Sequence, residues 1–249
     1  MKLWGGRFSR QRDPDFERFS ESFSVDHRLI ACDLAVNRTW VQELGRARVL
    51  TAKEVRGLTR GLDAIARYVK NHPRWAAGQA AEDVHTWVEQ RLEREIGPLA
   101  WKLRTGRSRN DLVATETRLY LKSEILNLKS EIVGLLKSLL KLAKRHERAV
   151  FPGFTHLQPA QPILFGHYVL AYFEMFRRDL GRLEDCRVRA DELPMGAGAL
   201  AGTTFHIDRV RLARELGFAR VAQNSLDVTS DRDFVCEAIS ACADRKSVV

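Results

Sequence analysis

Two polar segments of the chain hold residue types that could do chemistry. The first, residues 105–111, reads Thr-Gly-Arg-Ser-Arg-Asn-Asp and directly precedes a long apolar repeat. A helix that begins here offers unpaired N–H groups and a partial positive charge, which favour an anion. Arg107 and Arg109 add planar donor forks that match carboxylates, and Asn110 offers a donor and an acceptor. The segment predicts a carboxylate site; a helix start capped by Ser108, with both arginines in water, is the alternative.

The second polar segment, residues 151–162, contains Thr155 and His156 among prolines and glutamines. Histidine is the side chain whose charge changes most readily near neutral pH, so it can transfer protons in catalysis. His156 is therefore a candidate acid or base. The alternative is a histidine that only fixes its loop through hydrogen bonds.

Long helices are predicted around these segments. Helical periodicity indicates helices at residues 26–48, 51–70, 82–96, 108–150, 163–192 and 208–216, and a helical stretch from residue 225. Thr51 and Glu54 have the spacing of a capping box. Strand signals are nearly absent, and residues 151–162 are expected to form a loop. The predicted fold class is all-α, with an N-terminal helical domain at residues 1–105 and the first part of a helical-bundle domain at residues 106–249.

The helix predicted over residues 108–150 has an unusually broad apolar face. Its first row, spaced by seven residues and flanked by two further apolar rows, consists of Leu112, Leu119, Leu126, Val133 and Leu140. A face this wide is typical of a bundle core rather than of a two-stranded coiled coil. We therefore expect Leu126 to be buried in a complete bundle, and we expect the apolar rows of residues 112–142 to lack some of their partners in a truncated chain.

The composition narrows the class of protein. The chain has 249 residues and a formal net charge of +9, but its basic residues are spread among acidic ones without a run of like charges. This pattern does not favour a nucleic-acid or membrane partner. The four cysteines and seven histidines show no metal-ligand spacing, so we expect reduced thiols and no metal. With neither a signal peptide nor an apolar run long enough to cross a bilayer, the default location is cytoplasmic.

Six segments of the chain resemble, in order, those of argininosuccinate lyases, a family of the fumarase/aspartase superfamily. They are residues 3–8, 81–86, 105–111, 153–162, 198–202 and 224–234, so the resemblance covers essentially residues 1–240. The segment at 105–111 separates this family from fumarases, aspartases and adenylosuccinate lyases. The resemblance implies a fumarase/aspartase-like bundle of long helices with a smaller N-terminal α-domain. It also implies a homotetramer whose active sites are shared between subunits.

The resemblance further implies a reaction and its residues. The reaction is the β-elimination of argininosuccinate to arginine and fumarate, a carbon–nitrogen lyase activity of arginine biosynthesis that needs no cofactor and no metal. His156 matches the position assigned to acid/base work, next to Thr155. The positions implied for substrate binding, of which Asp26 is the least specific match, are Ser22, Asp26, Asp83, His85, Arg109, Asn110 and Thr155.

One signature of the family is missing from this sequence. The loop Gly-Ser-Ser-x-Met-Pro, which carries the catalytic serine, is absent, and the methionines are Met1, Met175 and Met195 only. We therefore expect an N-terminal portion that ends before this loop and is inactive alone. The alternatives are another lyase of the superfamily, a crystallin-like structural relative and an inactive fragment.

Overall fold

The computed structural model describes residues 13–79 and 81–244, in two compact units. The first unit comprises the chain up to residue 117 together with residues 192–230, and the second comprises residues 118–191 together with the chain from residue 231. The family-like segment at residues 3–8 lies outside the described residues. No helix among the described residues is long and apolar enough to cross a membrane. The predicted domain boundary near residue 105 stays a prediction.

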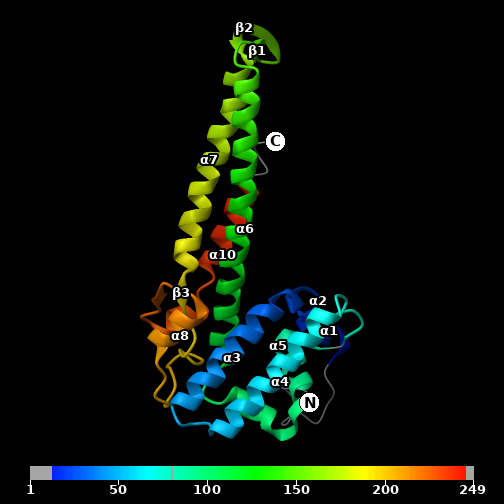
Figure 1. Ribbon diagram of the computed structural model, residues 1–249, viewed down its shortest axis with the longest axis vertical. Coiled ribbons are helices and arrows are strands. Elements are labelled where there is room, and N and C mark those ends of the chain that lie inside the picture. The colour runs from blue at the N-terminus through cyan, green and yellow to red at the C-terminus, as the bar shows by residue number, and fades with distance from the viewer. Residues whose placement is uncertain (1–12, 80, 245–249) are drawn as a thin grey trace. The chain divides into compact units, whose positions relative to one another are not determined.

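The first unit is built on helices from the N-terminal part of the chain (Figure 1). Its elements are α1 (Pro14–Ser20), α2 (Phe23–Asp26), η1 (His27–Leu29), α3 (Ile30–Arg46), α4 (Ala52–Asn71), α5 (Val84–Ile96), η2 (Gly97–Arg104), the start of α6 (Arg109–Arg145), β3 (Glu192–Leu193), α8 (Arg209–Leu216), β4 (Arg220–Val221) and α9 (Ser225–Ser230). The core side chains of α3, α4 and α5 include Trp40, Leu62 and Leu92, which are fully buried. The capping box predicted at Thr51 and Glu54 is confirmed, because each residue's side chain bonds the other's backbone N–H.

The second unit contains the remainder of α6, α7 (Phe165–Ala190) and α10 (Asp233–Asp244) (Figure 1). Ile125 and Ile132 of α6 pack with Leu183 and Cys186 of α7 and with Ala238 of α10. The predominance of helix confirms the all-α prediction. The 3-10 helix η2 was not predicted, and the helix expected from residue 26 is regular only from Ile30.

The prediction that residues 151–162 form a loop is wrong. These residues form an antiparallel hairpin of β1 (Val150–Thr155) and β2 (Gln158–Leu164), in which Thr155 pairs with Gln158. The sequence did not predict this hairpin because proline cannot donate a hydrogen bond to a neighbouring strand. The prolines also interrupt the alternation of apolar and polar residues that marks an ordinary strand. The strands remain regular where aromatic rings support them: Phe151 lies 5.0 Å from Tyr168 and 5.8 Å from Phe165, centroid to centroid.

Leu126 is not buried within the single chain, so its burial in a complete bundle stays a prediction. Leu126 is 54% exposed, and Val133 and Leu140 of the same row are exposed as well. The buried row of α6 is shifted by one position, to Ile125 and Ile132. With three adjacent apolar rows, the sequence alone does not decide which row a single chain buries. In this chain the other helices of the unit bury Ile125 and Ile132 and partly cover Leu121 and Leu128 of the neighbouring row.

Candidate functional site

Arg109, at the first position of α6, is held by acidic residues of α5. Its guanidinium forms a salt bridge with Asp83 and lies 3.8 Å from Oε2 of Glu89. Asp83 is in turn fixed as the N-cap of α5, where its Oδ1 accepts a hydrogen bond from the backbone N–H of Thr86 at 2.7 Å. Burial by itself would raise the pKa of Asp83, but the hydrogen bond and charge of Arg109 outweigh it and lower that pKa. The result is an ionised carboxylate that orients a partly exposed donor fork.

Ser22 and Asp26 are attached to the same end of α5. The Ser22 hydroxyl donates to Oδ2 of Asp26 at 2.6 Å, and Oδ1 of Asp26 accepts from the backbone N–H of Val84 at 3.0 Å. The backbone N–H of Ser22 also donates to the carbonyl of Glu82 at 2.9 Å. Burial raises the pKa of Asp26, with the negative charge of Asp83 acting in the same direction. Ser22, Asp26, Asp83 and Arg109 thus come together around the start of α5.

His85 is the second residue of α5 and is buried. Its Nδ1 is 2.7 Å from Oδ2 of Asp33 and 3.4 Å from Oε2 of Glu116. Sequence analysis selected His85 but missed both carboxylates. The signal for Asp33 was present: Asp33 and Asn37 lie four residues apart on the face of α3 that buries Trp40. Buried polar residues at helical spacing within an apolar face require partners, which here come from distant helices.

The glycine-rich segment that follows β3 is held by the last residue of the 105–111 motif. Oδ2 of Asp111 accepts hydrogen bonds from the backbone N–H groups of Gly196 and Gly198 at 3.1 and 2.8 Å, and Oδ1 accepts from Ser108 at 3.0 Å. Burial raises the pKa of Asp111, and these three N–H donors oppose that rise. Asp111 therefore joins the start of α6 to the segment at residues 196–202.

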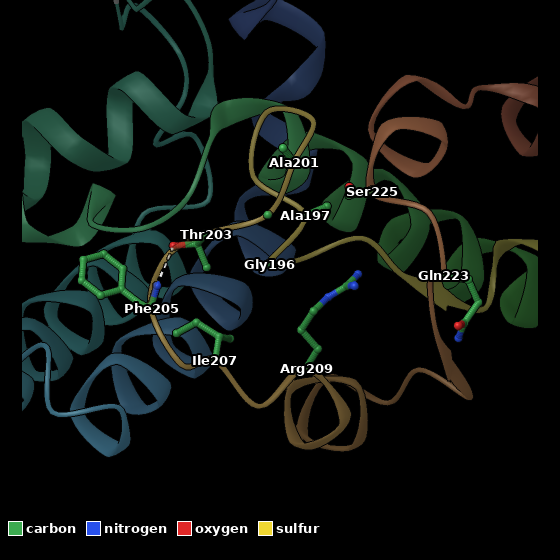
Figure 2. Close-up of a pocket in the computed structure, with 10 residues that line it drawn as sticks. Gly196, Ala197, Ala201, Thr203, Phe205, Ile207, Arg209, Gln223 and Ser225 are labelled. Carbon is green, nitrogen blue, oxygen red and sulfur yellow. Dashed lines mark hydrogen bonds between the residues drawn. The ribbon is translucent and has the colours of Figure 1, made fainter.

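A cavity of about 280 Å³ lies beside this segment. Figure 2 shows the Arg209 side chain extending into the ring formed by the glycine-rich loop, Gln223 and Ser225. Its guanidinium donates to three backbone carbonyl oxygens, those of Leu193, Met195 and Ala222, at 3.1–3.2 Å. Because carbonyl groups already engage its nitrogens, Arg209 supports the loop rather than offering a free anion site.

Asn110, Thr155 and His156 are exposed. Asn110 belongs to the first unit, next to Arg109, whereas Thr155 and His156 belong to the second unit. His156 and Leu157 form the two-residue turn of the β1–β2 hairpin, with φ values of +51° and +62°. Such values are uncommon for residues other than glycine and fit the primed turns of two-residue hairpins. The structure therefore presents His156 at an exposed hairpin tip.

The sequence matches the family described as Lyase over residues 6–245. It is 49% identical over 242 residues to the argininosuccinate lyase of Desulforudis audaxviator, covering 97% of this chain and 52% of that protein. It is 47% identical over 247 residues to the argininosuccinate lyase of Pelotomaculum thermopropionicum, with the same coverage.

A solved structure of an EDDS lyase variant with bound fumarate is similar in fold. It has a TM-score of 0.80 and 26% identity, covering 96% of this chain and 48% of that one. The predicted fumarase/aspartase-like fold is thereby confirmed. This chain spans about half the length of the curated relatives it matches. Since the family match covers nearly all of its residues, the chain belongs to the Lyase family.

Proposed function

We propose that this chain is part of an argininosuccinate lyase, which splits argininosuccinate into arginine and fumarate by β-elimination. The observation that carries the proposal is the identity of 49% and 47% to two argininosuccinate lyases over 97% of the chain. The likeness to a lyase that holds fumarate supports the same product class.

The chemistry explains why a held arginine is useful. Removal of the Cβ proton of the succinyl group places negative charge beside a carboxylate, and preorganised donors stabilise that charge. Asp83 and Glu89 orient Arg109 without covering it, since its side chain remains 27% exposed. Arg109 and Asn110 would bind substrate carboxylates, and the Ser22 hydroxyl, whose proton goes to Asp26, would offer its oxygen as an acceptor to the amino acid end of the substrate. Asp26 and Asp83 would face the cationic nitrogen groups of the same substrate, with His85 beside them.

Thr155 and His156 would complete the site as substrate-binding and proton-transfer groups. The exposed hairpin tip that carries them is suited to reach a site on another chain. The exposed row of Leu126, Val133 and Leu140 likewise favours further copies of the chain as partners. We therefore propose a homotetramer in the cytoplasm, with active sites shared between subunits and without a cofactor.

The test is fumarate release, followed by its ultraviolet absorbance. A protein of the relatives' full length that carries this chain should release fumarate from argininosuccinate, but not from aspartate or adenylosuccinate. This chain alone should release none, because it spans about half of the relatives. Turnover of a different substrate in the panel would contradict the proposed specificity, and no turnover of any substrate would contradict the activity.

A further inference from the structure

Four polar side chains form a buried cluster in the first unit, and His85 is the only one of them that the proposed reaction uses. Asp33, Asn37, His85 and Glu116 come from α3, α5 and α6, and none is more than 4% exposed. Burying polar groups costs free energy unless they are hydrogen-bonded, so the direction of each bond in this cluster carries information.

The hydrogen bond from Arg107 fixes the direction of the other hydrogen bonds in this cluster. A guanidinium has donors and no acceptor, so its bond to Asn37 must end on the amide oxygen. The Asn37 amide nitrogen then donates to Oδ1 of Asp33, at 2.6 Å. Oδ2 of Asp33 is left facing Nδ1 of His85 at 2.7 Å. Since a carboxylate only accepts, Nδ1 must carry the proton, and in the Nδ1–H tautomer Nε2 is the acceptor nitrogen.

Glu116 completes the cluster from the other side. Neither of its carboxyl oxygens accepts a hydrogen bond from any residue that the structure describes. Burial and the negative charge of Asp33 raise the pKa of Glu116 well above its ordinary value. A protonated Glu116 has an O–H that can donate to Asp33. A neutral Glu116 also leaves Asp33 as the one carboxyl group of the pair that acts only as an acceptor.

We propose that Asp33 and Glu116 are positioning residues that hold His85 in its Nδ1–H tautomer, with Nε2 as a hydrogen-bond acceptor for a substrate N–H. His85 lies close enough to Asp26 and Asp83 to interact electrostatically with both carboxyl groups. The inference rests on the proposed function only for the identity of the ligand. The tautomer itself follows from the hydrogen bonds of the chain.

A divalent cation is the competing occupant. Asp33, His85 and Glu116 each offer one ligand atom, and these atoms lie within 4.8 Å of one another. Coordination through Nδ1 of His85 would require that nitrogen to lose its proton. Arg107, which is hydrogen-bonded to Asn37 in the same cluster, adds positive charge that disfavours a second cation. The two possibilities therefore predict opposite states of Nδ1.

The experiment reads the tautomer directly in this chain, by long-range 1H–15N imidazole spectra, with His85→Gln to assign the signal. Wild type should show Nδ1–H. In Asp33→Asn, Arg107 still bonds the Asn37 oxygen, so the Asn37 NH2 still donates toward position 33. The new amide must therefore turn its oxygen toward Asn37 and its NH2 toward His85. Because Nδ1 of His85 then accepts a hydrogen bond, the imidazole proton should move to Nε2. Adding Asn37→Asp supplies an acceptor there, lets the amide at position 33 turn back, and should restore Nδ1–H.

Glu116→Gln is the matched control, because its amide can donate to Asp33 as a neutral Glu116 does. It should keep the Nδ1–H tautomer, and added Zn²⁺ should leave the His85 signal of wild type unchanged. An Nε2–H tautomer in wild type, or a Zn²⁺ shift that Glu116→Gln abolishes, would overturn the proposal. If Asp33→Asn does not fold, the spectrum of the wild-type chain still decides which tautomer His85 adopts.

The same variants in a full-length lyase test the link to catalysis. Asp33→Asn should lower kcat/KM by about 10–100-fold, in the range of other residues that orient a functional histidine, and the double variant should recover part of the loss. Loss of activity with an unchanged tautomer would overturn the positioning role. If wild type itself makes no fumarate, the proposed function fails while the spectra of this chain still decide the tautomer.

Discussion

Ile132→Ala is the variant that best tests the packing of the second unit. Ile132 is 2% exposed and belongs to the cluster that joins α6 to α7 and α10. The substitution removes three carbons, worth about 0.8 kcal/mol each for transfer from water. The cavity left behind adds to this, so the free energy of unfolding should fall by about 2–5 kcal/mol.

Leu126→Ala is the matched control on the neighbouring row of the same helix. It also removes three carbons, but Leu126 is 54% exposed, so about half of the transfer term applies and no enclosed cavity forms. The loss should be about 1 kcal/mol, reduced by a few tenths because alanine favours helix. The predicted contrast between the two sites is therefore at least a factor of two.

Urea unfolding followed by far-ultraviolet circular dichroism measures both losses, provided that the slope of the transition is unchanged. Ile132→Val, expected to cost about 0.5–1.5 kcal/mol, keeps the test usable in a marginally stable chain. Equal losses for the two alanine variants at low protein concentration would refute the assignment of the buried row. A loss for Leu126→Ala that grows with protein concentration would show that another copy covers this face.

Three further outcomes are expected. Arg109→Lys in a full-length lyase should reduce kcat/KM, because lysine keeps the charge but not the two-pronged donor; unchanged kinetics would remove Arg109 from the site. The pKa of Glu54 is lowered to about 2, chiefly by the hydrogen bond from Lys102, so its stabilisation is present above about pH 4.5 and lost as the pH falls toward 2. Thermal midpoints should show the deficit of Glu54→Gln shrinking over that range, and a constant deficit would contradict the assignment. Gly198→Ala should destabilise the fold, because φ at this position is +64° and the new Cβ would lie 2.5 Å from a backbone oxygen. Gly181→Ala on α7 has open space around the new Cβ, so it should stabilise the fold by up to about 1 kcal/mol, as urea unfolding of both variants would show.

The helices were predictable because their signals are local. The capping box at Thr51 and the glycine after α5 mark boundaries within a few residues of the chain. Periodicity also identified α6 and α7 to within five residues at each end. The prediction missed the hairpin because prolines interrupt the strand signal of both strands, and the contact of Phe151 with Phe165 of α7 is not visible in the local pattern.

The candidate site was predictable only where a motif carried it. Arg109 and Asp83 were selected from separate motifs, but their salt bridge links residues 26 positions apart and is not visible in either. Asp33 and Glu116 belong to no motif at all. They meet His85 only because three helices pack together, which is information that no sequence window contains.

Asp111 gives the glycine-rich segment a particular dynamic character. Ala197 packs with Ala222 and Val228, whereas the N–H groups of Gly196 and Gly198 on either side of it both donate to one carboxylate that also accepts from Ser108. Opening of this segment must break hydrogen bonds to Oδ2 of the same carboxylate whose Oδ1 accepts from Ser108 at the start of α6. The amide hydrogens of Gly196 and Gly198 should therefore exchange with solvent at a common rate, tied to fraying of the first turn of α6.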